Sequence, residues 1–420
     1  MTRLRLEPTA LLCHCEQRST LPRHGEEHSD EAIFHPESDM NFDFNDDQLS
    51  LRDAVARWAE KAFTFDRRHD LAKAGGKTRA VYQELADLGL AGLTLPADHD
   101  GLGLGAVEAM VVMEELGRAL VNAPFAAGAL VAPALMQSAS PEVQAHWGPR
   151  MASGEALVVW AHQERQARYQ LEQVATRAVA SESGASASAS YRLTGLKSLV
   201  PAGDEADAFL VAAQERNDER DGISLFLVEK GAPGLKVRAY PTHDGARAAD
   251  LTLSDTPAVR VCSQAMDAME YAADVGLAAS CAEAVGLMDQ LVAITAEYLN
   301  TRKQFGVPIA SFQALRHRMA DVKMQLELAR SMSYFAHLKL GEPAPARRRA
   351  LSQAKVQLGR SMRQVGQECI QMHGGIGVTD EYIASHYFKR LTMLEMAWGD
   401  TLHHLGEVSQ RMRDTAGVFA

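Results

Sequence analysis

A helix junction in the stretch YLNTRKQFGVPIASFQ, residues 298–313, carries the side chains best suited to chemistry. A long apolar helix is predicted to run into this stretch, to stop at Gly306 and to restart near Ser311. Arginine gives a forked donor for phosphate, an aromatic ring gives a flat face, and glutamine amides can hydrogen-bond a ring or a ribose. The residues concerned are Arg302, Gln304, Phe305 and Gln313. Together they indicate a flat, phosphate-bearing cofactor; taken alone, they could equally be a surface arginine and a core phenylalanine that close a helix.

A second motif, QMHGGIG, follows at residues 371–377. Glycines directly after a helix usually form its C-terminal cap and turn, so this pattern alone is weak evidence for a ligand. No strand is predicted before it, which excludes a dinucleotide-binding βαβ unit. The pair Gly374 and Gly375 would nevertheless let the backbone after Gln371 come close to a cofactor, because glycine has no Cβ.

The composition excludes several classes of protein. A chain of 420 residues with 46% hydrophobic residues can bury two or three cores. A net charge of −11 argues against a nucleic-acid surface, which needs clustered positive charge. We expect no membrane span, because we find no apolar run in the sequence that approaches the ~20 residues that a bilayer requires. The five cysteines are scattered, which favours neither a disulfide framework nor a zinc site and makes a reducing cytoplasm the expected location.

Residues 1–39 differ in composition from the rest. They are rich in Arg, Glu, His and Ser, have no helical or strand period, and contain Cys13-His14-Cys15 without further metal ligands at workable spacing. No apolar segment of a signal peptide is present in them. We interpret this part as a disordered extension, with Met40 as a possible natural start.

The periodicity predicts a helical domain over residues 40–155, a β domain over 156–261 and a helical bundle over 262–420. In the first, Asn45 and Gln48 have capping-box spacing before an apolar stripe. In the second, short β-branched segments alternate with turns, and we expect a small antiparallel domain or barrel with loops at 181–190 and 214–222. In the third, we expect helices over about 264–304, 312–340, 346–371 and 400–414, apolar on more than one face as in buried bundles.

The motifs and the α, β, α order resemble the acyl-CoA dehydrogenase family of flavoproteins over nearly all of the chain from Met40. The resemblance implies a fold with an N-terminal helical domain, a middle β barrel and a C-terminal four-helix bundle. It also implies FAD as cofactor, an acyl-CoA as substrate and electron-transfer flavoprotein as electron acceptor. In the family, the residues matching Arg302, Phe305 and Gln313 reach the pyrophosphate and adenine of a neighbouring subunit's FAD. Those matching Gln371, Gly374 and Gly375 belong to the same adenine-side contact.

The catalytic base that the family requires is missing. Oxidising a saturated thioester removes an α-proton, which needs a carboxylate whose pKa burial raises toward the working pH. The usual position of that glutamate, twenty-three residues after the second paired glycine, holds Trp398. The less common position, ten residues before Gly286, holds Gly276, and Asp274 is turned roughly 200° away from it on a helix.

Two acids lie near Trp398 in the sequence, Glu395 and Asp400. Either could be a displaced base, while an N-cap of the last helix is an equally good interpretation of Asp400. A second departure concerns the Trp-x-Thr segment that the family places against the flavin. The matching residues are Leu199-Val200-Pro201, and proline has neither a hydroxyl nor a backbone N–H. The usual Thr-Glu-Pro loop has likewise become HQERQARYQ, residues 162–170.

The resemblance therefore implies a supporting subunit of a heteromeric enzyme, paired with a homologous catalytic subunit. Within the family the sequence is most similar to the small subunits of pimeloyl-CoA dehydrogenases, which implies a dicarboxylyl-CoA substrate. The alternatives are a self-sufficient homomeric dehydrogenase that uses Asp400 or Glu395, and a flavin-less binding subunit. We expect no metal site at His386 or His403-His404, and a solvated face at Arg347–Arg349 in preference to contacts with CoA phosphates.

Overall fold

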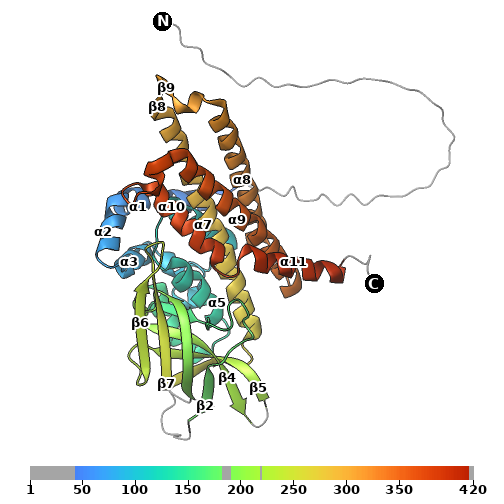
Figure 1. The fold of residues 1–420 in the computed structure, drawn as a ribbon. Coiled ribbons are helices and arrows are strands. Elements are labelled where there is room, and N and C mark those ends of the chain that lie inside the picture. Colours follow the sequence, from blue (N-terminus) through green and yellow to red (C-terminus); the bar gives the residue numbers. More distant parts are fainter. Residues whose placement is uncertain (1–42, 182–190, 218–219, 416–420) are drawn as a thin grey trace, which may run out of the picture. The chain divides into compact units, whose positions relative to one another are not determined.

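The computed structural model describes residues 43–181, 191–217 and 220–415. The chain divides into two units, Met1–Phe44 and Asn45–Ala420, and everything below concerns the second. The expected disordered extension and the expected loop at 181–190 lie almost wholly outside the described residues. Helices come first in the chain, then strands, then helices again, which confirms the predicted fold class (Figure 1).

The first helical part begins at a capping box. Asn45 Oδ1 accepts from the backbone N–H of Gln48 at 2.8 Å, and Gln48 Oε1 accepts from the N–H of Asn45 at 3.1 Å, as the spacing predicts. The helices of this part are α1 (Asp46–Ala62), α2 (Phe65–Lys73), α3 (Arg79–Asp87), α4 (Ala106–Arg118), α5 (Ala132–Met136) and α6 (Pro141–Ala152). Two short 3₁₀ helices, η1 (Leu90–Gly92) and η2 (Ala97–His99), lie between α3 and α4, and a π-helix, η3 (Ala126–Val131), runs directly into α5.

The strands form a closed barrel beside these helices. They are β1 (Val158–Ala161), β2 (Arg177–Ala180), β3 (Tyr191–Pro201), β4 (Ala208–Asn217), β5 (Arg220–Glu229), β6 (Leu235–Pro241) and β7 (Arg247–Cys262). The path runs β1-β4-β2-β3-β7-β5, and an additional β4–β5 pairing closes it. Side chains from alternate positions fill the interior, among them Phe209, Val211, Phe226 and Leu251.

Two expectations for this part are wrong. The barrel is not purely antiparallel, because β1 and β2 both pair with β4 in parallel. The predicted charged loop at 214–222 is largely strand, since β4 and β5 stay paired to the register Asn217↔Arg220. Glu215 is buried there because Ser224 Oγ and Tyr191 Oη each donate to its carboxylate at 2.8 Å.

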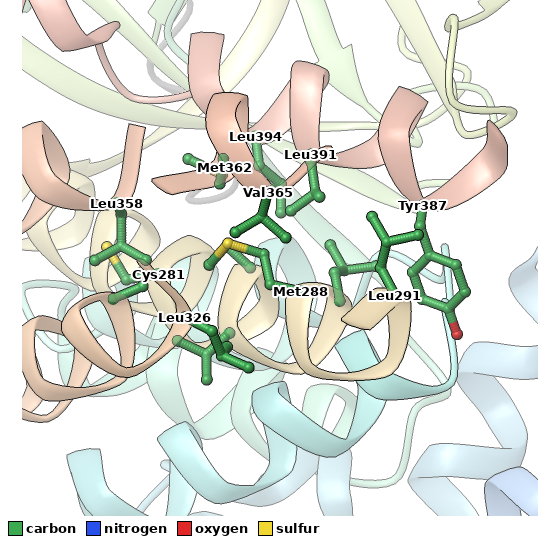
Figure 2. Close-up of a cluster of buried hydrophobic side chains, with 14 of the residues drawn as sticks. Cys281, Met288, Leu291, Leu326, Leu358, Met362, Val365, Tyr387, Leu391 and Leu394 are labelled. Atoms are coloured by element: carbon green, nitrogen blue, oxygen red, sulfur yellow. The ribbon is translucent and has the colours of Figure 1, made fainter. Parts of the chain in front are cut away.

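The C-terminal part is a bundle around one long helix, α7 (Met266–Thr301). α8 (Gln313–Leu338), α9 (Ala344–His373) and α10 (Ile383–Met396) pack on it, and α11 (Thr401–Thr415) packs on α9. Figure 2 shows the side chains they share, with Met288 and Leu291 of α7 facing Leu326, Val365 and Leu391 of the other helices. The sequence predicts four of these helices but not α10, in which the consecutive residues His386, Tyr387 and Phe388 are weak helix formers.

The expectation that no apolar run is long enough for a bilayer is wrong for α7. By length and composition alone this helix could cross a membrane. Its most apolar window is 78% buried inside the protein, because helices of the bundle and α4 cover it. The central helix of a folded bundle has the same composition as a spanning helix, so burial has to be known before the two can be told apart.

Candidate functional site

A cavity of about 470 Å³ lies where the first helices, the barrel and the bundle meet. Apolar side chains line it from three directions, including Leu116 of α4, Phe125 before η3 and Leu277 of α7. Trp160 and His162, at and just after β1, form the barrel side, and Trp398, between α10 and α11, completes the wall. A pocket of this volume, mainly apolar with a few polar groups, is suited to a small-molecule ligand. We call it the central cavity.

Three of its rings form what we call the aromatic stack: Trp160, His162 and Trp398. The His162 and Trp398 rings are nearly parallel, 8° apart in plane with centroids at 5.4 Å. The ring centroid of Trp160 lies 4.2 Å from that of His162 and 6.0 Å from that of Trp398. Burial, with a smaller contribution from Lys197, lowers the pKa of His162 to about 3, so the imidazole is neutral in the stack.

The turn that carries Trp398 is strained and tightly held. Trp398 has φ 59° and Gly399 has φ 105°, so a bulky residue adopts the left-handed region that favours glycine. His404 Nε2 hydrogen-bonds the carbonyl oxygen of Trp398 at 2.9 Å. Lys355 Nζ donates to the carbonyl oxygens of Leu394 and Ala397 at 2.6 and 2.8 Å. A strained residue persists only when its surroundings fix it in this way.

Neither acid next to Trp398 in the sequence lines the central cavity. Asp400 Oδ1 accepts from the backbone N–H of His403 at 2.8 Å, which is the N-cap interpretation of this residue. Glu395 Oε1 accepts from Thr401 Oγ1 at 2.7 Å and pairs with Arg363 at 3.1 Å. Both carboxylates are therefore used in fixing the start of α11.

A buried network of charges forms another wall of the cavity, and the sequence analysis assigns it no role. Arg390 of α10 pairs with both oxygens of Glu283 on α7, at 2.6 and 2.9 Å, and with Asp244 of the barrel at 2.7 Å. Burial works to lower the pKa of Arg390, but the two carboxylates raise it above its ordinary value. Arg68 of α2 donates to the backbone oxygen of Asp244 at 2.9 Å. This network joins all three parts of the fold, and neither spacing nor periodicity in the sequence could signal it.

Several buried polar atoms along the cavity have no hydrogen-bond partner among the described residues. They belong to Asn122, Trp160, His162 and Glu205. A buried N–H or carbonyl oxygen without a partner is costly unless water or a ligand satisfies it. The central cavity therefore remains a ligand-binding space, although the family's base is absent from it.

The predicted cofactor residues lie elsewhere, around a hairpin at the far end of α7. β8 (Lys303–Gln304) pairs with β9 (Val307–Pro308), and the turn residues Phe305 and Gly306 have φ 53° and 81°. Positive φ at both positions is typical of a type I′ turn, which favours glycine, so Phe305 is strained there. Phe305 as a whole residue is 92% exposed. We call residues 303–308 the cofactor hairpin.

The other predicted cofactor residues flank this hairpin. Arg302, before it, is exposed and has no ion-pair partner within the described part of the chain. Gln313, after η4 (Ile309–Ser311), is exposed at the start of α8. A guanidinium, a phenyl face and an amide are thus exposed at one helix junction, where a group from outside this chain can reach them. Within the chain, the Gln313 amide nitrogen lies 3.5 Å from His317 Nε2.

The glycine motif lies at the same end of the bundle, in η5 (Gly374–Val378) after α9. The rings of Tyr298 on α7 and His373 on α9 are 4.7 Å apart, which brings the two motifs together. A Cβ built on Gly375 would meet no described atom within 4 Å, and its φ is not in the left-handed region. Nothing described in this chain therefore requires glycine at 375, whereas close approach of an outside cofactor would. The side chain of Gln371 is exposed beside it.

The cofactor hairpin and the central cavity are far apart within one chain. Gly276 at the cavity and Tyr298 beside the hairpin are twenty-two residues apart on α7, about 33 Å at 1.5 Å per residue. None of the six predicted cofactor residues lines the cavity. They are Arg302, Phe305, Gln313, Gln371, Gly374 and Gly375.

Two minor expectations need correction. Arg347 is buried, and its Nε donates to Asp274 Oδ2 at 2.8 Å, so Arg347–Arg349 is not wholly a solvated face. The expectation that His386 lacks ligand-forming neighbours is also wrong, because His69 and Asp380 lie close to it. Both nitrogens of His386 are already engaged, Nδ1 with Arg68 Nη1 at 2.9 Å and Nε2 with the Asp380 carbonyl oxygen at 2.8 Å, so we propose no metal site there.

Comparison with known protein domains accounts for the whole folded part. The N-terminal domain of acyl-CoA dehydrogenases matches residues 45–155, the middle domain matches 160–256 and the C-terminal domain matches 264–412. The chain belongs to the acyl-CoA dehydrogenase family. This is a family of FAD-binding flavoproteins, and the oxidoreductase class follows from it.

Individual relatives of this acyl-CoA dehydrogenase family member are distant. Acyl-CoA dehydrogenase FadE27 of Mycobacterium tuberculosis is 28% identical over 348 residues, which is 80% of this chain and 89% of the relative. The short-chain specific acyl-CoA dehydrogenase of Megasphaera elsdenii is 31% identical over 206 residues, 47% of this chain and 54% of the relative. Among solved structures, a chain of the ChsE4-ChsE5 complex from Mycobacterium tuberculosis aligns with a TM-score of 0.80 at 27% identity, covering 90% of this chain and 100% of that one.

Proposed function

We propose that this protein is the supporting subunit of a heteromeric, FAD-dependent acyl-CoA dehydrogenase, in which a homologous partner supplies the catalytic base. The proposal depends on a contrast between two sites. One end of α7 carries the exposed cofactor hairpin, whereas the other end lies beside a cavity that lacks the family's base. The cofactor hairpin is exposed and faces outward, while the family's two base positions hold Trp398 and Gly276. The similarity to a chain of a two-component complex, the ChsE4-ChsE5 complex, supports it.

The reaction proposed for the heteromer is α,β-dehydrogenation of an acyl-CoA. A base of the partner takes the α-proton, and a double bond forms between the α- and β-carbons as the β-hydride leaves. FAD bound in the heteromer would supply the hydride acceptor, and electron-transfer flavoprotein is the proposed acceptor of its electrons. The residues of this chain proposed to hold the neighbour's dinucleotide are Arg302, Phe305, Gln313, Gln371, Gly374 and Gly375.

The residues at the hairpin fit such a group. An exposed guanidinium suits the pyrophosphate, and open space beside Gly375 admits a flat ring against the backbone. The dicarboxylyl-CoA class, pimeloyl-CoA among them, rests on the sequence resemblance alone. A cytoplasmic location and domain boundaries near residues 155 and 261 complete the proposal.

The self-sufficient alternative is weaker for a geometric reason. A base has to reach the substrate, directly or through one water. Asp400 and Glu395 are hydrogen-bonded at the start of α11 and do not line the central cavity. Four acids among the described residues do line it. Glu283 and Asp244 are paired with Arg390, and Asp274 is paired with Arg347. The fourth, Glu205, accepts at Oε2 from the backbone N–H groups of Thr78 and Arg79 at 2.8 and 2.6 Å.

Flavin chemistry of the chain alone and of the pair tests the proposal. The chain is purified by itself and together with the product of its neighbouring gene, and flavin absorbance is recorded before and after adding acyl-CoA. We expect retained FAD and bleaching only for the pair. Full FAD occupancy and turnover by the chain alone would overturn the supporting role.

The role of Arg302 is tested in the same complex by Arg302→Ala. Hydrogen bonds to charged groups contribute about 1.5–3 kcal/mol, so we expect roughly 10–100-fold weaker FAD retention. Lys303→Ala is the matched control, since it removes the neighbouring exposed cation of the hairpin. Equal flavin content in the two variants would count against the assigned role.

A further inference from the structure

The two positions where the family keeps its base touch each other in this chain. A Cβ built on Gly276 would lie 2.5 Å from Cε2 and Cζ2 of the Trp398 indole. The indole therefore occupies the space that any side chain at position 276 would need. Two bases that act on one carbon from different elements must both point at that carbon. The point between positions 276 and 398 is accordingly where the reacting carbon would lie, and here it is filled by the indole.

The surroundings hold the indole in that place. Trp398 keeps a left-handed φ of 59°, which a bulky side chain adopts only under constraint. The constraint comes from His404 on its carbonyl oxygen and from Lys355 on the preceding turn of α10. On the barrel side, the parallel ring of His162 fixes the plane of the indole. The backbone strain and the ring packing together show that the Trp398 indole is held in one position.

We propose that Trp398 is a plug: its indole closes the reacting position of this chain's own acyl pocket, so that an acyl thioester cannot enter there. If this chain is the supporting subunit, as proposed above, the plug has a second consequence. In the heteromer, only the partner's pocket can bind an acyl-CoA for reaction. A purely structural tryptophan is the competing explanation. Trp398 differs from one in that it is only half-buried and lines the open central cavity, with a glycine opposite it.

Binding of octanoyl-CoA to the isolated full chain, measured by calorimetry, tests the plug. Wild type is compared with Trp398→Ala and with Trp147→Ala, which removes a buried indole of α6 that does not line the cavity. Because the removed ring frees apolar space for the acyl chain, we expect Trp398→Ala to bind roughly tenfold tighter or more. Trp147→Ala should bind as weakly as wild type.

One result would overturn the plug: octanoyl-CoA binding that is no tighter to folded Trp398→Ala than to wild type, whether both proteins bind it weakly or both bind it tightly. If Trp398→Ala does not fold, Gly276→Ala provides a second test of the contact between Gly276 and the indole. Its added methyl group should displace the indole from the stack, so the near-ultraviolet circular dichroism should weaken while the helical signal stays. An unchanged near-ultraviolet spectrum would mean that Gly276 does not accommodate the indole.

These measurements use neither the partner nor bound flavin. Failure of the plug would therefore leave the flavin-retention result of Arg302→Ala as the test of the supporting role. If the chain is not a supporting subunit, it should bind and turn over flavin alone. That result does not depend on how tightly octanoyl-CoA binds.

Discussion

Single side chains inside the barrel explain how the loop at residues 162–170, which differs from the family pattern, is held in place. Lys197 is fully buried, and its ammonium donates to Glu164 Oε1 at 2.8 Å. Glu164 also accepts from the hydroxyl of Thr176 at 2.7 Å and from the backbone N–H of Ala175 at 2.8 Å. Burial works to raise the pKa of Glu164, but these partners outweigh it and lower that pKa. The altered loop at residues 162–170 is thus fixed by a buried ion pair.

Removing one partner of this pair should destabilise the fold. Lys197→Met leaves the Glu164 carboxylate buried without its cation, which typically costs about 3–5 kcal/mol. The free energy of unfolding, from urea denaturation, measures this loss. Adding Glu164→Gln to the same variant should restore part of it.

The control is an exposed pair of the same type. Lys323 and Glu327 form a half-exposed i,i+4 pair at 2.7 Å on α8. Lys323→Met should change the free energy of unfolding by less than about 1 kcal/mol, because water screens the pair. Equal losses for Lys197→Met and Lys323→Met would contradict the buried-pair argument.

Counting residues from the glycine motif is enough to identify Trp398 and Gly276 as the positions without a base. Counting cannot show that the two are in contact, since one follows α10 and the other lies on α7, more than a hundred residues earlier. The Arg390, Glu283 and Asp244 network is beyond sequence reasoning for the same reason. Its members come from the barrel and two helices and meet only in the folded chain.

At the scale of elements, α4 and α7 cross in direct backbone contact. A Cβ on Gly286 of α7 would overlap the carbonyl oxygen of Glu114 on α4, and one on Gly117 would overlap that of Glu283. Two glycines thus let the helices approach more closely than side chains would permit. Arg118 and Arg330, which share the carboxylates of Glu114 and Asp289, tie the same helices and α8 together.

Adding one methyl group at this crossing should be strongly destabilising. Gly286→Ala must push α4 away from α7, and we expect a loss of about 3 kcal/mol or more in the free energy of unfolding. Gly406→Ala is the matched control, because Gly406 lies in α11 with no atom within 4 Å of an added Cβ. There the same substitution should stabilise by roughly 0.5–1 kcal/mol, since alanine favours helix. Thermal unfolding of both variants would show shifts of opposite sign.

Elements with a local signal are the predictable ones. The capping box of α1 and the long apolar runs of α7 to α9 are set by residues a few positions apart. The parallel pairing of β1 with β4 joins segments about fifty residues apart, and no local pattern specifies its direction. The charged segment 214–222 looks like a loop in the sequence because the partners of Glu215 are on other strands and leave no local signal.

For the whole molecule, buried neutral histidines set the response to acid. Burial lowers the pKa of His162 and His404 to about 3 and that of His337 to about 4. Well above pH 6.5 these rings are neutral both in the folded and in the unfolded chain, so they favour neither state. Between pH 6.5 and about 4 the unfolded chain binds protons that the folded chain does not. Stability is therefore lost as pH falls through this range.

Denaturation midpoints between pH 7 and pH 5 test this directly. Each of the three histidines should cost about 1–2 kcal/mol over that interval. His337→Gln, which cannot take up a proton, should reduce the pH-dependent loss by about 1–2 kcal/mol. His337 is remote from the central cavity and bonds Ser333 O at 2.8 Å, which a glutamine amide can imitate. A pH slope identical to that of wild type would show that this histidine does not stay neutral in the fold.

One helix, α7, carries Gly276, against which the plug packs, nearer its start and the base of the cofactor hairpin at its end. We expect substitutions at one end to leave the other end unchanged. Such separability gives evolution a route after gene duplication: one copy can lose its own chemistry and still be kept by selection for what it lends to the other.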